Sequence, residues 1–259
     1  MTANQSVKQM STPKAERIFE VTNADVTSDT VTVAVTVYNY GNYLGECLDS
    51  IKDQAYERLE IVVVDDCSAD DSLTIAHKWM EENHSRFSRV SLWKNEKNSG
   101  AAASKNGAFD KARSELVMLV DADNLLYPRA IKRLHYALKQ GDFIAAYSQL
   151  EKFGDKFGVG DADFWNPEYF KGGNYIDGMA LYKKEAWEAV GGWESVFNGW
   201  EDYDFWCKIA EQGKSAIFVP ELLCRYRVHG NSVTSMARRN LVTLWARMKE
   251  RHPWVLPST

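Results

Sequence analysis

Strands of the fully buried type alternate with amphipathic helices along the first half of the chain, and this alternation limits the fold more than any other feature. Residues 31–37 read VTVAVTV and residues 59–64 read LEIVVV. Such β-branched runs are typical of strands that are covered on both faces. Between them, apolar residues recur with helical spacing from Leu44 to Ile51. Strands joined by helices form βαβ units, so the sequence predicts an α/β fold with a mostly parallel central sheet flanked by helices.

The alternation continues as far as residue 148 and becomes less regular beyond it. The pattern predicts further helices over 70–82, over 100–113, from Pro128 onward and over 199–213, and further strands over 90–93, 116–120, 143–148 and 215–220. Residues 151–174 are rich in Gly, Asp and aromatic residues and show no period. A long irregular stretch of this kind is often a binding loop.

The charge balance and the cysteines limit the class of protein. Lys and Arg number 31 against 36 Asp and Glu, so the net charge is −5. A nucleic-acid-binding protein usually has a basic excess, and we therefore expect no nucleic-acid partner. The four cysteines form no C-x-x-C pair, and no stretch reaches the length of about 18 apolar residues that a membrane span needs. The N-terminal residues contain no apolar signal region, so we expect a cytoplasmic protein with reduced thiols.

Two carboxylates directly follow one of the predicted buried strands. Asp121 and Asp123 come after the strand at 116–120, and residues i and i+2 of an extended segment point the same way. The pair can share one divalent cation, or one carboxylate can bind the metal while the other meets a ribose or a water. Oxygen ligands of this kind suit Mg²⁺ or Mn²⁺. The same tripeptide recurs at 161–163, but it follows Gly160 instead of a strand, so we expect that copy to be loop surface.

A second acidic pair, Asp65 and Asp66, ends the strand at 59–64. A carboxylate there can accept a hydrogen bond from the N–H of a base or from ribose hydroxyls. The alternative is a helix-capping role, because Ser68 and Asp70 lie where cap residues belong. Both interpretations stay open for Asp65, whereas we favour a ligand contact for Asp66.

Residues 98–107 form a small, glycine-flanked segment that opens a predicted helix. Its helix N-terminus could face a ligand, and Lys105 could supply a cation. The segment matches neither the P-loop pattern nor the G-x-G-x-x-G fingerprint, and tight helix packing explains it equally well.

Three acidic residues, Glu201, Asp202 and Asp204, stand in the first turn of the predicted helix at 199–213. The helix dipole favours acids there, but three such residues set among several Trp exceed what capping needs. The same dipole keeps a carboxylate ionised at neutral pH, as a general base requires.

His229 lies in the segment RYRVHGNSVT, between two arginines and a Gly-Asn turn. A single His is most often structural. The nearby cations and the loop-like sequence also fit a role in binding a metal or a phosphate.

Seven motifs in order carry a resemblance to a known family: VTVYN, VVVDDCSADDS, NSGAAASKNGA, LVDAD, GGWE, GWEDYDFW and YRVHGNSVT. Together, from Val31 to Thr234, they resemble the inverting glycosyltransferases of family 2, which have the GT-A fold. The resemblance implies one Rossmann-like domain over 30–234. Its first half, 30–125, would bind a nucleotide sugar at the carboxyl ends of the strands, and its second half, 126–234, would hold the acceptor and the catalytic base.

The resemblance also implies which residues bind the donor. Tyr38 and Asp66 would contact the nucleoside, with Asp66 on the base. Lys105 takes the place that an Arg often holds near the base and the diphosphate. The chain departs from the family pattern at two positions: Lys105 replaces this Arg, and Thr36 stands where many members have Pro.

The metal ligands and the base are implied in the same way. Asp121 and Asp123 correspond to the D-x-D pair on ribose and metal, His229 resembles an additional metal ligand, and Mn²⁺ or Mg²⁺ is the implied cofactor. Asp202, in the Glu-Asp pair, corresponds to the catalytic base, and we expect the neighbouring Glu201 and Trp200 to border the sugar-acceptor site.

The implied activity is transfer of a sugar, with inversion, from a nucleotide-diphosphate donor to a hydroxyl group. We expect a UDP-sugar as donor and a glycan or a lipid-linked molecule as acceptor, as in the synthesis of a cell-surface polysaccharide. Two alternatives stay open. One is a nucleotide-sugar-binding module without turnover, which would have no use for a base at Asp202. The other is a nucleotidyltransferase, which the turn at 38–42 disfavours because it contains no Lys or Arg.

Two segments flank the expected domain. Residues 1–29 are polar, and we expect a tail or an appended segment. Residues 235–259 predict a basic amphipathic helix and a tail, with Leu241, Leu244, Trp245 and Met248 on one face. This helix either docks on the domain or, through 238–251, contacts the inner face of the membrane and brings the enzyme to a lipid-linked acceptor.

Overall fold

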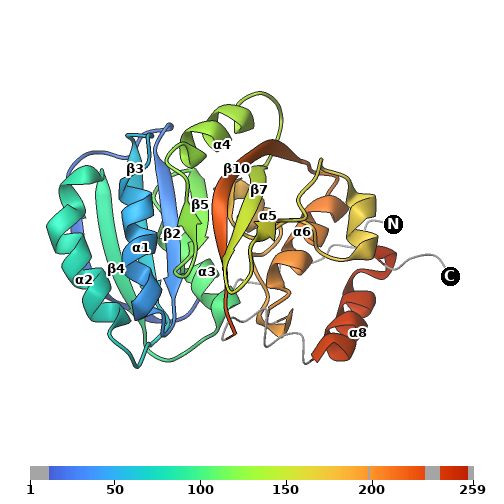
Figure 1. The fold of residues 1–259 in the computed structure, drawn as a ribbon, viewed down its shortest axis with the longest axis horizontal. Helices are drawn as coiled ribbons and strands as arrows, with labels where there is room; N and C mark the ends of the chain where they lie inside the picture. Colours follow the sequence, from blue (N-terminus) through green and yellow to red (C-terminus); the bar gives the residue numbers. More distant parts are fainter. Residues whose placement is uncertain (1–11, 198, 231–239, 256–259) are drawn as a thin grey trace.

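A mixed β-sheet runs through the computed structural model and carries helices on both faces (Figure 1). The structure describes residues 12–197, 199–230 and 240–255. The order of the strands is β1 (Ala15–Thr22), β4 (Arg89–Asn95), β3 (Leu59–Asp65), β2 (Val31–Val37), β5 (Leu116–Asp121), β9 (Ala180–Lys183), β7 (Ala145–Gly154), β10 (Ala216–Val228) and β6 (Leu125–Leu126), with β8 (Gly158–Val159) paired to β7.

The sheet is parallel in two blocks. Strands β4, β3, β2 and β5 are parallel neighbours, and so are β7 and β10. Strands β1, β9 and β6 pair in the antiparallel sense. The prediction of an α/β fold with a mostly parallel central sheet is therefore confirmed.

Helices cover both faces because the central strands present apolar side chains to both. Val33 and Val35 pack with α1 (Gly41–Lys52) and α2 (Ser72–Asn83), whereas Ala34 belongs to the core that contains α3 (Ala101–Lys111) and α6 (Glu201–Glu211). The other helices are α4 (Ala130–Leu138), α5 (Lys184–Ala189) and α8 (Leu241–Arg251). None of the helices in the described residues is long and apolar enough to cross a membrane.

Several predicted boundaries differ from the structure. Strand β7 runs to Gly154 instead of ending at 148, so it enters the stretch that we expected to be irregular. Helix α4 begins at Ala130, two residues after Pro128. Strand β10 extends to Val228, well past the predicted end at 220, because it pairs with β7 along its length. His229 therefore directly follows a strand, and the segment before it is not the loop that we expected.

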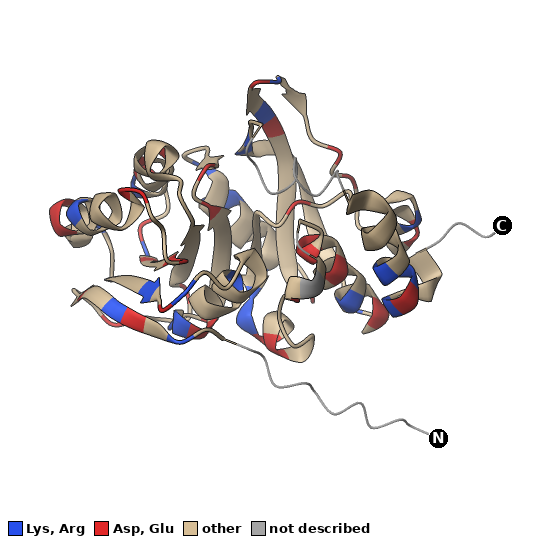
Figure 2. Ribbon diagram, turned by 90° about the horizontal axis from the view of Figure 1, so that it is seen from below, with Lys and Arg blue, Asp and Glu red and all other residues tan. Residues whose placement is uncertain are grey.

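The N-terminal segment contributes an edge strand. Strand β1 pairs with β4 from Ala15 opposite Asn95 to Thr22 opposite Arg89, so the sheet begins before the segment that the sequence indicated. Figure 2 shows acidic and basic residues close together on this strand. Charged side chains are usual on an edge strand because they discourage pairing with a further chain, which explains why a polar segment belongs to the sheet.

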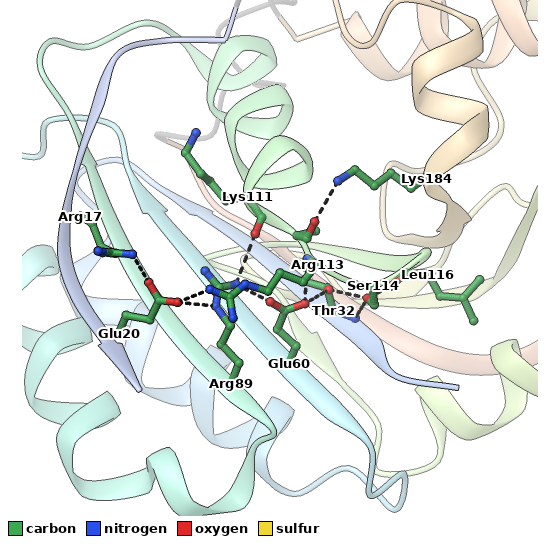
Figure 3. Close-up of polar contacts among 11 residues, drawn as sticks. Arg17, Glu20, Thr32, Glu60, Arg89, Lys111, Arg113, Ser114, Leu116 and Lys184 are labelled. Carbon is green, nitrogen blue, oxygen red and sulfur yellow. Dashed lines mark hydrogen bonds and ion pairs between the residues drawn. The ribbon is translucent and has the colours of Figure 1, made fainter. Parts of the chain in front are cut away.

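A buried charge network joins β1 to the central strands at the amino ends of the parallel strands (Figure 3). Glu60 is fully buried and accepts hydrogen bonds from Arg89, from the Thr32 hydroxyl and, at 3.0 Å, from the backbone N–H of Arg113. Arg89 is also buried and donates from Nε to Glu20 at 2.9 Å. The network lies at the opposite end of the strands from the acidic residues at their carboxyl ends.

Replacing Arg89 with Met is expected to lower the free energy of unfolding by about 3 kcal/mol, because Glu60 is left buried without its charged partner. Urea unfolding measures this change. Arg58→Met is the matched control, since Arg58 pairs with Asp29 while its own side chain is 62% exposed. It should lose less than about 1 kcal/mol. Equal losses in the two variants would contradict the account of the network.

Candidate active site

The carboxyl ends of β2, β3 and β5 meet at one edge of the sheet. Val37 lies opposite Asp65, and Thr36 lies opposite Asp121, so the residues that follow these strands converge. A cavity of about 510 Å³ opens there, which we call the first cavity. Seven of the predicted site residues line it: Tyr38, Asp66, Lys105, Asp121, Asp123, Glu201 and Asp202.

Asp65 and Asp66 have different surroundings. Asp65 is buried and accepts from the backbone N–H of Ser68 at 3.0 Å, as expected for the turn before a helix. Asp66 accepts from Asn95 Nδ2 at 2.7 Å and from the backbone N–H groups of Ser99 and Gly100 at 2.9 and 2.8 Å. Asp66 thus fixes the loop before α3 against the wall of the first cavity.

Lys105 lies buried among carboxylates. Its Nζ is 3.0 Å from Asp202 Oδ1 and 3.2 Å from Glu201 Oε1. Burial alone would lower the pKa of Lys105, but the charges of Asp202, Asp121 and Glu201 outweigh it and raise the pKa well above its usual range. The ammonium group therefore stays charged and places a fixed cation beside the carboxylates of the site.

Asp202 stands at the start of α6 with both carboxylate oxygens near Lys105 Nζ. Burial raises the pKa of Asp202 to about 6, although Lys105 opposes the shift. A carboxylate with this pKa is ionised at neutral pH and is a better proton acceptor than an ordinary Asp, which is what a general base requires.

Gly178 leaves the space in which the Asp202 carboxylate lies. A Cβ built on Gly178 would be 2.6 Å from Asp202 Oδ2 and 2.8 Å from Oδ1. Any other residue at position 178 would therefore displace the carboxylate.

Gly178→Ala is expected to reduce turnover by about tenfold or more, because a small misplacement of a catalytic group has large effects on rate. Gly45→Ala is the control, since nothing lies within 4 Å of a Cβ at that helical position. It should keep full activity and gain about 0.5–1 kcal/mol in stability. Steady-state kinetics and urea unfolding of both variants check this. Full activity in the Gly178→Ala variant would show that the Asp202 carboxylate need not lie where the structure places it.

The D-x-D carboxylates lie at the same edge of the sheet. Asp121 accepts from Thr36 Oγ1 at 3.3 Å, and burial raises the pKa of Asp121 to about 6 although Lys105 opposes it. Asp123 Oδ2 is 3.0 Å from His229 Nε2. Burial raises the pKa of Asp123, and the bond to His229 partly offsets that shift. The structure thus brings together Asp123 and His229, which the sequence separates by more than a hundred residues.

These donors fit a divalent cation chemically, although the arrangement is incomplete on its own. Within the described ranges, no group of three or more His, Cys, Asp or Glu side chains is close enough to hold a metal ion. Carboxylate oxygens and an imidazole nitrogen are ligands that Mn²⁺ accepts, and Mg²⁺ in nucleotide sites is commonly held by one or two carboxylates with substrate phosphates completing the shell. The pair Asp123–His229 with Asp121 nearby matches such a partly protein-made site.

A second cavity of about 650 Å³ adjoins the first and shares Asp177, Gly199, Asp202 and Tyr226 with it. Its walls include three further aromatic side chains together with the predicted metal ligand His229: Tyr175, Trp200, Tyr203 and His229. Aromatic faces of this kind suit the apolar faces of sugars. Asp202 therefore lies where the two cavities meet.

The second D-x-D copy borders this second cavity. Asp161 and Ala162 line it, while the Asp161 side chain is 81% exposed and lies 3.4 Å from Lys152 Nζ. The prediction that this copy lies on an exposed loop is confirmed. The sequence did not indicate that the loop also forms a wall of the second cavity.

Glu201 and Trp200 have separate surroundings. Glu201 is buried and accepts from Lys105 and, at 2.6 Å, from the backbone N–H of Gly199, so its carboxylate holds the loop before α6. Trp200 lines the second cavity and packs edge-on against Trp245 of α8, with ring centroids 4.9 Å apart.

Sequence reasoning missed Asp177, which lines both cavities. Burial raises the pKa of Asp177 to about 6, and the nearby Asp202 adds to the shift. The available signal was an Asp-Gly pair directly before the short strand at 180–183, but the irregular sequence around it hid that strand's place in the sheet.

Comparison with known proteins identifies the family. The model described as Glycosyl transferase family 2 matches residues 32–191, which is more than half of the chain. The chain belongs to glycosyltransferase family 2. The family match includes the D-x-D pair and ends before Asp202 and His229, so the arrangement at these two residues comes from the structure.

Several relatives of this family 2 chain are named as glycosyltransferases. A glycosyltransferase of Haemophilus influenzae is 28% identical over 234 residues, which are 80% of this chain and 68% of the relative. Glycosyltransferase GlyG of Streptococcus pneumoniae is 34% identical over 115 residues, which are 44% of this chain and 37% of GlyG. The chain thus spans little more than a third of GlyG.

Two solved structures share the fold of this family 2 chain, which is the GT-A fold of glycosyltransferases. One is S. aureus TarS 1–349 in complex with UDP-GlcNAc, with a TM-score of 0.68 and 19% identity over 80% of this chain and 60% of TarS 1–349. The other is the mannosyltransferase PcManGT from Pyrobaculum calidifontis in complex with GDP-Man and Mn²⁺, with a TM-score of 0.64 and 26% identity over 88% of this chain and 68% of PcManGT.

Proposed function

We propose that this protein is a metal-dependent, inverting glycosyltransferase that moves a sugar from a nucleotide-diphosphate donor, a UDP-sugar, to a hydroxyl group of a glycan or lipid-linked acceptor. The observation that carries the proposal is the position of Asp202 at the junction of two cavities. The first cavity contains the residues that the family resemblance assigns to the donor. The second has aromatic walls suited to an acceptor sugar.

The chemistry follows from that position. An acceptor hydroxyl in the second cavity would give its proton to Asp202, and its oxygen would attack the anomeric carbon of a donor in the first cavity. Attack from the side opposite the diphosphate inverts the anomeric centre. Direct displacement needs one base and forms no covalent sugar intermediate, in contrast to retaining hydrolases, in which a second carboxyl group acts as the nucleophile.

The donor would lie along the first cavity. Tyr38 and Asp66 would contact the nucleoside, Asp121 the ribose, and the Lys105 ammonium group would offset negative charge near the diphosphate. The complexes of TarS with UDP-GlcNAc and of PcManGT with GDP-Man support a nucleotide-sugar donor for this fold.

A divalent cation, Mn²⁺ or Mg²⁺, would be held by Asp123, His229 and Asp121. When bound, it would supply Lewis-acid stabilisation to the departing diphosphate. The Mn²⁺ in the PcManGT complex supports this assignment.

The proposed acceptor is a glycan or a lipid-linked molecule. The O-antigen biosynthesis protein RfbC of Myxococcus xanthus, 26% identical over 76% of this chain and 15% of RfbC, supports a role in polysaccharide synthesis.

Helix α8 docks on the domain through Leu244 and Met248, and its exposed Leu241 and Val242 support peripheral contact with the inner membrane face through 238–251. Residues 238 and 239 lie outside the described residues.

A thermal-shift screen of nucleotide sugars with Mn²⁺, followed by a donor-hydrolysis assay, tests the proposal. A ligand present at many times its Kd raises the Tm, so at least one UDP-sugar should stabilise the protein and then be hydrolysed. Stabilisation without any turnover would favour a binding module. Stabilisation by nucleoside triphosphates alone would favour a nucleotidyltransferase.

A further inference from the structure

The C-terminal segment packs against the helix that begins with Asp202. Helix α8 and the turn Pro253–Val255 lie beside α6 (Figure 1). Met248 and Val255 are fully buried in the same core cluster as Phe205 and Trp206 of α6. This segment lies beyond the part of the chain that the family model matches.

The C-terminal segment binds α6 through ion pairs with Asp204. Asp204 is fully buried, and its Oδ1 lies 2.7 Å from Arg251 Nε and 2.9 Å from His252 Nε2. Its Oδ2 lies 3.1 Å from Lys208 Nζ, one turn further along α6. Three cationic side chains, two of them from the C-terminal segment, thus converge on one buried carboxylate.

His252 joins both ends of α6. Its Nε2 faces Asp204 in the first turn, and its Nδ1 lies 2.6 Å from Glu211 Oε1 in the last turn. Ionised carboxylates only accept hydrogen bonds, so both ring nitrogens donate and the ring is an imidazolium. Burial lowers the pKa of His252, but the hydrogen bonds to Asp204 and Glu211 raise the pKa by more than burial lowers it. The net shift of the pKa is upward.

Asp202 and Asp204 leave α6 on opposite sides. Residues two positions apart on a helix point about 200° away from each other. Asp202 therefore faces the cavities, and Asp204 faces the C-terminal segment. On the cavity side, Lys105 contacts Asp202. The first turn of a helix has unpaired N–H groups and frays readily, so its position depends on contacts from outside.

We propose that Arg251 and His252 are positioning residues for glycosyl transfer, which hold Asp204 and thereby aim Asp202 at the acceptor hydroxyl. The proposal rests on the proposed function, because it concerns the same general base. A purely structural role predicts that breaking these contacts lowers stability and leaves the rate of the folded enzyme unchanged. A positioning role predicts a lower kcat with an unchanged KM for the donor.

The test compares Asp204→Asn and His252→Ala with the control Glu211→Gln, all measured on the full chain well below the Tm of each variant. Glu211→Gln weakens the contact of His252 Nδ1 with residue 211 and leaves the ion pairs of Arg251 and His252 with Asp204 in place. The two test variants should lose about tenfold to a hundredfold in kcat with the UDP-sugar found in the screen. Their donor KM and their UDP affinity by calorimetry should match the control. Arg251→Met provides the same comparison if His252→Ala does not fold.

Hydrogen exchange of residues 201–205 gives a readout that needs no donor. These amides should exchange faster in Asp204→Asn and His252→Ala than in Glu211→Gln. Equal exchange and equal kcat in all three variants would overturn the positioning role. If the wild-type protein turns over no nucleotide sugar, the proposed function fails. Equal exchange in the three variants would then still show that Arg251 and His252 do not hold the first turn of α6.

Discussion

Replacing Asp202 with Asn is expected to reduce sugar transfer by a factor of about a hundred to ten thousand, the scale of a lost general base. The amide keeps the shape of the side chain but cannot take up the proton of the acceptor. Binding of UDP should change little, because Asp202 lies where the second cavity adjoins the first, whereas Asp66 and its loop, where the nucleoside is expected, line the first cavity alone. Steady-state kinetics with the identified donor, together with calorimetry of UDP, measure both quantities.

Glu201→Gln is the matched control for this prediction. Glu201 is adjacent in sequence and also contacts Lys105, but its second oxygen accepts from the N–H of Gly199 and it is buried. Its substitution should loosen the loop before α6 and reduce activity less than Asp202→Asn does. If Glu201→Gln abolishes turnover and Asp202→Asn keeps it, the base has been assigned to the wrong one of the two residues.

The second large effect is expected at the D-x-D pair. Asp123→Ala should reduce the Mn²⁺-dependent affinity for UDP by a factor of about 100 or more, since even residues behind a metal ligand commonly contribute tenfold to a hundredfold. The reason is that Asp123 and His229 are the pair that the structure brings within 3.0 Å. Calorimetry of UDP with Mn²⁺ and with EDTA measures the loss.

A double variant, Asp161→Ala with Asp163→Ala, is the control because it removes the same tripeptide from the loop of the second cavity. It should bind UDP with Mn²⁺ as the wild-type protein does. Wild-type affinity for UDP that is the same with Mn²⁺ and with EDTA would contradict the metal assignment. So would equal losses in the double variant and in Asp123→Ala.

The sequence predicts the parts of the fold in which local pattern and burial agree. Strands β2, β3 and β5 are mostly β-branched or aliphatic, with Glu60 as the charged exception inside β3, and each is followed by polar residues at the edge where the first cavity opens. Topology alone then brings Tyr38, Asp66 and Asp121 together. The sequence therefore predicts which residues line the first cavity at this edge of the sheet.

Other parts depend on contacts that local pattern does not show. Strand β10 contains Pro220 and Glu221, which resemble a turn, yet a shift in register between Val219 and Leu222 accommodates them within the pairing to β7. Strand β1 is polar because it lies at an edge. The contacts of Arg251 and His252 with Asp204 join distant segments, so only the folded chain reveals them. The pairing of Asp123 with His229 also joins distant segments, and the family resemblance, not local pattern, pointed to it.

The configuration of the released sugar tests the central claim most directly. Proton NMR can follow the hydrolysis or transfer of the UDP-sugar that stabilises the protein, with Mn²⁺ present, and record the anomeric form of the first product before it equilibrates. With an α-linked donor the account predicts a β product, formed by the wild-type protein and lost in Asp202→Asn. A first-formed α product, or equal turnover by Asp202→Asn, would contradict direct displacement with Asp202 as the base.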